Sequence, residues 1–115
     1  MPIRENLIRL LQAARAREQA FVEALSSAER AAEGSPSDWS PKDLVAHMAD
    51  WRLRKAGDLG ILARGGEPPD DPEFDSANQI IYQRHHAKSW EDVLQYSSEA
   101  WHALEKALER RRRRL

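Results

Sequence analysis

The sequence contains no cysteine and no long apolar run. Without cysteine, disulfide bonds, thiolate metal ligands and cysteine nucleophiles are all excluded. No segment approaches the roughly 20 apolar residues of a membrane-spanning helix, and the first residues are charged and amphipathic rather than signal-like. We therefore expect a cytoplasmic protein with no membrane partner. At 115 residues the chain is long enough for one domain with a modest core.

Positive charge is scarce outside the C-terminal end. The formal net charge is -1, but Arg110–Arg114 are consecutive arginines, so the rest of the chain is distinctly acidic. An acidic body disfavours a broad nucleic-acid surface, and we do not expect nucleic acid as a partner. We expect the Arg-rich tail, residues 110–115, to complement the dipole of the last helix. A contact with nucleic acid or an anionic membrane surface is the alternative for this tail.

Apolar residues recur at helical spacing through most of the chain, and no segment alternates as a strand does. Gly34-Ser35-Pro36-Ser37 and the proline-rich stretch 65–73 interrupt this pattern. The sequence therefore predicts an all-α fold, a single helical-bundle domain over residues 1–115. Its four predicted helices cover Ile3–Glu33, Pro41 to about Arg64, Phe74–His86, and a last segment capped by Ser89.

The clearest motif is the start of the second predicted helix. Ser40 suits the N-cap, Pro41 suits the first helical position, and Asp43 can close a capping box. His47 and Trp51 follow four residues apart, hence on one face of the helix, at the border of its apolar arc. A histidine in this position can ligate a metal or transfer a proton, or it can simply pack and form hydrogen bonds. The residues alone leave these interpretations open.

The other histidines add little to a metal site. His85 aligns with apolar residues of the third predicted helix, whereas His86 and His102 fall on solvated faces. One chain can therefore bring together at most His47 and His85, fewer than the three protein ligands of a typical catalytic zinc site. The sequence also has no His-x-x-x-His pair, no serine with a closely spaced histidine partner and no glycine-rich phosphate loop.

Two segments carry a family resemblance. The segment WSPKDLVAHMADWRLR resembles the second helix of the DinB/YfiT-like four-helix-bundle proteins, which have a Trp-Ser-x-x-Asp-x-x-x-His-x-x-x-Trp pattern. The segment ANQIIYQRHHAKSWEDVLQYSSEAWHALEKAL is similar to the ClbS/DfsB branch, in which an Asn-x-x-Ile-Tyr stretch leads into a Ser-x-Glu-Asp-Val-Leu helix. Together the matches cover about residues 39–55 and 77–108.

The resemblance implies a four-helix bundle with a crossover between helices 2 and 3. DinB-like proteins commonly hold a divalent metal, such as zinc or nickel, with three histidines. His47 matches the first of these, and the His-x-x-x-His helix that supplies the other two has no counterpart here. The chain is thus similar to a shortened member that lacks the C-terminal helix and has an incomplete metal site. Apolar surface left open by that missing helix predicts a homodimer.

We expect a small protein that binds a small molecule or stress metabolite and protects against it. The ClbS/DfsB branch includes a protein that protects its producer by hydrolysing a DNA-damaging metabolite. The candidate pocket residues are His47, Trp51, Tyr82 and His85, and no cofactor is required. One alternative is a metal-dependent hydrolase or thiol transferase in which His47 ligates the metal. Another is a non-catalytic helical dimerisation module.

Overall fold

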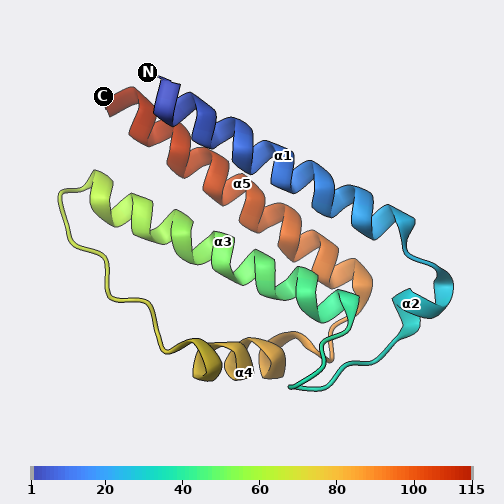
Figure 1. Cartoon of the computed structure of the whole chain (residues 1–115). Coiled ribbons are helices and arrows are strands. Elements are labelled where there is room, and N and C mark those ends of the chain that lie inside the picture. Colours follow the sequence, from blue (N-terminus) through green and yellow to red (C-terminus); the bar gives the residue numbers. More distant parts are fainter. Residues whose placement is uncertain (1, 115) are drawn as a thin grey trace. The chain divides into compact units, whose positions relative to one another are not determined.

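The computed structural model describes residues 2–114, and the side chains of residues 5–109. These residues form helices and no named strand (Figure 1), which confirms the all-α prediction. No described helix combines the length and the apolar character that a membrane span requires. The chain divides into two compact units, Met1–Ala32 and Glu33–Leu115, and each is described by itself. The helices are α1 (Pro2–Ala24), α2 (Ser27–Ala31), α3 (Pro41–Ala63), α4 (Phe74–His85) and α5 (Trp90–Arg114).

The first unit corrects the prediction of one continuous helix over Ile3–Glu33. α1 ends at Ala24, and the short helix α2 begins after Ser26. Ser26 is the N-cap of α2 and forms a capping box with Glu29, in which each side chain bonds the backbone N–H of the other residue. These hydrogen bonds lower the pKa of Glu29. The capping box therefore starts a new helix, although the apolar spacing continues through this region.

The predicted start of the second helix is confirmed at α3. Ser40 accepts a hydrogen bond from the backbone N–H of Asp43, the Asp43 carboxylate accepts one from the backbone N–H of Ser40, and Pro41 occupies the first turn. Gly34 packs closely against this helix start. A Cβ atom at Gly34 would collide with the Asp43 carboxylate and lie 2.5 Å from the backbone nitrogen of Ser40. A larger residue at position 34 would therefore force the loop away from α3.

Helices α3 and α5 lie side by side and run in the same direction (Figure 1). Small side chains occupy their buried positions: Ala46 and Ala49 on α3, and Ser97 and Ala100 on α5, are each at most 1% exposed. Small residues allow two helices to approach closely, because the side chains at the contact set the distance between the axes. The two helices thus form a rigid support for the side chains beside this contact.

Helix α4 confirms the third predicted helix and is held at both of its ends. Its N-cap is Glu73, whose carboxylate accepts hydrogen bonds from the first-turn backbone. After α4, Lys42 of α3 donates a hydrogen bond to the backbone carbonyl of Lys88. The segment of residues 64–73 leads into α4, and Lys55 of α3 forms an ion pair of 3.2 Å with Asp71 in this segment. α3, the 64–73 segment and α4 are therefore tied together by specific contacts.

Candidate functional site

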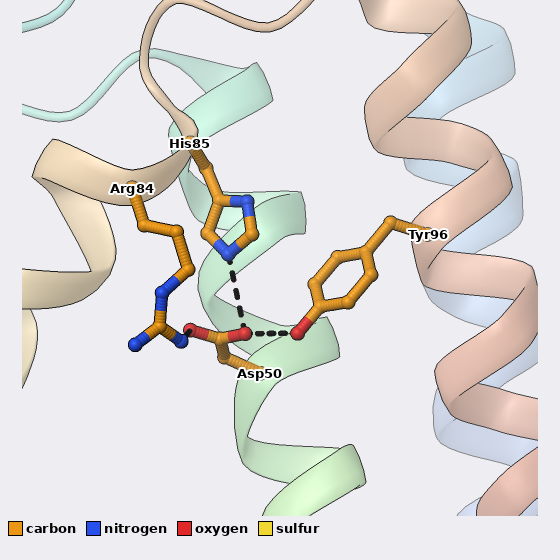
Figure 2. A network of polar contacts seen from close by, with 4 residues as sticks. All are labelled: Asp50, Arg84, His85 and Tyr96. Carbon is orange, nitrogen blue, oxygen red and sulfur yellow. Dashed lines mark hydrogen bonds and ion pairs between the residues drawn. The ribbon is translucent and has the colours of Figure 1, made fainter.

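A cluster of polar side chains surrounds Asp50 where α3, α4 and α5 meet (Figure 2). Asp50 projects from α3, and its side chain is only 7% exposed. Three donors reach its carboxylate: His85 Nε2 lies 3.2 Å from Oδ1, the Tyr96 hydroxyl also donates to Oδ1, and an Arg84 nitrogen lies 3.2 Å from Oδ2. The burial of a carboxylate is unfavourable unless it is paired and hydrogen-bonded, and this arrangement meets both requirements.

His85 is the most deeply buried member of the Asp50 cluster, with 2% of its side chain exposed. Burial lowers the pKa of His85, and the neighbouring Asp50 opposes this shift. A carboxylate can only accept, so the neutral imidazole carries its proton on Nε2 and donates it to Asp50. The other ring nitrogen, Nδ1, is buried and has no hydrogen-bond partner among the described residues. His85 therefore orients Asp50 rather than contacting a solute directly.

Tyr96 and Arg84 complete the cluster from α5 and α4. Burial, together with the Asp50 carboxylate, raises the pKa of Tyr96, so its hydroxyl stays protonated and donates to Asp50. The Tyr96 ring stacks on His85 with 4.8 Å between the ring centroids. Arg84 has a side chain that is 58% exposed, and its charge balances that of Asp50. The cluster thus has a neutral, buried end at His85 and a solvent-facing cation at Arg84.

A cavity of about 500 Å³ opens beside the Asp50 cluster. Ligand-binding pockets typically have volumes of about 300–1,000 Å³. The walls are mostly apolar, and the polar groups include Asp50, Arg84 and Tyr96 from the cluster. The remaining lining residues are Trp51, Leu53 and Arg54 of α3, Pro72 of the 64–73 segment, and Ser76, Ala77, Ile80 and Ile81 of α4. The cavity therefore joins an apolar wall to a small set of oriented polar groups.

His47 lies between two tryptophan rings on the other side of Trp51. Its ring centroid is 4.6 Å from that of Trp39 and 6.1 Å from that of Trp51. Burial lowers the pKa of His47, while Asp50 opposes the shift. The Nδ1 atom of His47 is buried without a hydrogen-bond partner among the described residues. This packing favours a neutral imidazole held by aromatic rings.

The four candidate pocket residues occupy different surroundings. Trp51 lines the cavity, and His47 packs on Trp51. His85 reaches the cavity only through its contacts with Asp50 and Tyr96. The Tyr82 hydroxyl donates a hydrogen bond of 2.9 Å to the backbone carbonyl of Gly34, and the Tyr82 ring stacks on His86. Tyr82 therefore holds the loop before α3, while Trp51 is the candidate that faces a solute.

The described residues do not fit the three-histidine metal site that the resemblance implies. Over residues 5–109, no group of three or more His, Asp or Glu side chains is placed to hold a metal ion. Each histidine has another neighbour: His47 packs on Trp39 and Trp51, His85 bonds Asp50, and His102 lies 3.3 Å from Glu105. The side chains of the Arg-rich tail lie outside the described residues. We therefore derive no chemistry through a metal.

Three central residues of this site were not among the sequence candidates. Asp50, Arg84 and Tyr96 contact one another across three helices. The available signal was Asp50, an acidic residue one helical turn after the buried Ala46. A carboxylate in such a position requires partners, but the sequence does not specify which side chains of α4 and α5 supply them.

Comparison with known proteins identifies the family. A family model described as the DinB superfamily matches residues 10–114. No match was found among curated proteins or among solved structures. The matched residues include the whole of α3, α4 and α5, and thus every helix that supplies the Asp50 cluster and the cavity. The chain belongs to the DinB superfamily.

Proposed function

We propose that this protein binds a small, largely apolar molecule in the cavity between α3, α4 and α5. The supporting observation is the cavity of about 500 Å³, in which apolar walls meet the oriented Asp50 cluster. Leu53 and Ile80, which line it, are 42% and 54% exposed. Large apolar side chains held open to solvent beside convergent polar groups are typical of ligand sites. Binding that sequesters a stress metabolite would make the protein protective.

We also propose that the chain is a member of the ClbS/DfsB branch. The Asn-x-x-Ile-Tyr stretch that suggested this branch lies on α4, where Ile81 lines the cavity and Tyr82 bonds Gly34. The parallel course of α3 and α5, joined through the 64–73 segment and α4, supports the four-helix bundle with a crossover (Figure 1). A single domain and a homodimer remain part of this proposal, and light scattering at tens of micromolar protein tests the dimer.

The proposed binding is tested with Nile red, an uncharged apolar fluorophore. We expect saturable fluorescence enhancement with one site per chain. The substitution Ile80→Glu places a charge on the apolar wall and should abolish this enhancement. Phe74→Glu is the matched control, because Phe74 is also an exposed apolar residue of α4, at 63% exposure, but lies outside the cavity lining. Equal enhancement in both variants would contradict binding in this cavity.

A further inference from the structure

Two arginines line the cavity and are available to a ligand. Arg84 uses one of its N–H groups on Asp50 Oδ2, and a guanidinium has five N–H donors. Arg54 lies with its guanidinium carbon 5.3 Å from the centroid of the Trp51 ring, and within residues 5–109 it forms no hydrogen bond or ion pair. Both side chains are exposed at the cavity wall. The cavity therefore offers unused cationic donors.

The carboxylate of Asp50 does not compete for these donors in the same way. Its two oxygens already accept from His85, Tyr96 and Arg84. The lining thus contains two arginines and one fully engaged carboxylate, an excess of one positive charge. Because Asp50 is engaged, a cationic ligand finds no free acceptor there. A ligand with a single negative charge balances the lining.

The acidic residues near the cavity rim are directed elsewhere. Asp71, which precedes the lining residue Pro72, pairs with Lys55 through both carboxylate oxygens at 3.2 Å. Glu73, which follows Pro72, accepts hydrogen bonds from the backbone N–H and the hydroxyl of Ser76. These carboxylates serve the 64–73 segment and the start of α4. They do not neutralise the two arginines in the cavity.

Resting on the proposed function, we propose that the ligand is an apolar monocarboxylate. Its carboxylate lies against the guanidinium groups of Arg54 and Arg84, which suit planar, bidentate recognition of a carboxylate. Its apolar part lies against Leu53, Ile80 and Ile81. Trp51 fixes Arg54 by stacking, and Asp50 fixes Arg84 by ion pairing, so both cations are oriented before the ligand arrives.

The test is displacement of Nile red by four molecules with the same eight-carbon chain: octanoate, 1-octanol, octylamine and octyl phosphate. An apolar cavity without an anion site would prefer 1-octanol, because burying an ionised carboxylate is unfavourable. We expect octanoate to displace Nile red at a concentration at least about tenfold below that of 1-octanol. Octylamine should be the weakest competitor, because it faces two cations.

Variants assign this preference to the two arginines. Arg54→Gln and Arg84→Gln should each weaken octanoate about tenfold or more, as expected for the loss of a charge-assisted hydrogen bond, and should leave 1-octanol within about twofold. Arg64→Gln is the matched control, because Arg64 is exposed and lies outside the cavity lining. Loss of Nile red binding in the two cavity variants would mean that these arginines support the wall, and would overturn the inference.

Each other outcome also decides. If Nile red binds but 1-octanol or octylamine competes as well as octanoate, the carboxylate class is wrong and the proposed function stands. Tighter competition by octyl phosphate would replace the carboxylate with a phosphate monoester. If Nile red shows no saturable binding to the unsubstituted protein, both the proposed function and the ligand class are overturned.

Discussion

Removal of the Asp50 carboxylate should strongly destabilise the unit that contains residues 33–115. The substitution Asp50→Ala leaves two buried donors, His85 Nε2 and the Tyr96 hydroxyl, without their acceptor. Each unsatisfied buried donor costs about 1–3 kcal/mol. Arg84 adds less than about 1 kcal/mol, because its side chain is mostly exposed. Allowing for reorientation of the imidazole, we expect a loss of about 3 kcal/mol in the free energy of unfolding, a large fraction of the typical 5–15 kcal/mol.

A conservative variant and a double-mutant cycle separate this effect from a simple change of volume. Asp50→Asn keeps one side-chain oxygen for His85 and Tyr96, so we expect a loss of only about 1 kcal/mol. Tyr96→Phe removes one donor, and its effect should be smaller by about 1 kcal/mol in the Asp50→Ala background than in the unsubstituted protein. Coupling of this size is expected only for residues that interact directly.

The assay is urea unfolding followed by tryptophan fluorescence. All four tryptophans lie within Glu33–Leu115, so the signal reports the unit that holds the Asp50 cluster. The dependence of the unfolding free energy on urea concentration should be unchanged, which would show that the variants unfold from the same compact state. A loss below about 1 kcal/mol for Asp50→Ala, or strictly additive effects with Tyr96→Phe, would refute this assignment of the buried contacts.

Three further predictions use the same unfolding assay. Gly34→Ala should lower the unfolding free energy by about 1–3 kcal/mol, because its Cβ has no room, whereas Gly57→Ala, at an exposed helical position with nothing within 4 Å, should raise it by about 0.5–1 kcal/mol; equal effects would contradict the packing of the loop. Stability should fall as the pH drops through about 6.5, since the lowered pKa of His85 means that the unfolded chain takes up this proton first, and His85→Gln should weaken this pH dependence. Lys55→Met should lower stability by less than about 1 kcal/mol, because its ion pair with Asp71 is half exposed, and a larger loss would show that the 64–73 segment depends on that pair.

Local signals in the sequence were sufficient for most helix ends. The Ser40–Asp43 capping box and the glycines at the end of α3 predicted that helix correctly, and α4 differs from its predicted range by one residue. The first helix was wrong, because apolar spacing was followed across Ser26 although Ser26 and Glu29 form a capping box. A capping box satisfies backbone groups at the helix end directly, so it decides where α2 begins.

The Asp50 cluster could not be predicted in the same way. The facing of His47 toward Trp51 follows from spacing along one helix, and their rings indeed lie 6.1 Å apart. The contact of Asp50 with His85 and Tyr96 depends on how three helices are placed side by side, with partners 35 and 46 residues away in the chain. Helical periodicity gives the face of each residue but not the axial position of one helix against the next.

Fluorine NMR of protein labelled with 5-fluorotryptophan tests ligand binding in the α3–α4–α5 cavity most directly. Trp51 lines the cavity, whereas Trp90 and Trp101 lie on α5 outside its lining. During titration with octanoate and with 1-octanol, the resonance assigned through Trp51→Phe should shift saturably, and those of Trp90 and Trp101 should stay in place. An unmoved Trp51 resonance with both molecules, or equal shifts of every resonance, would contradict a ligand site in this cavity.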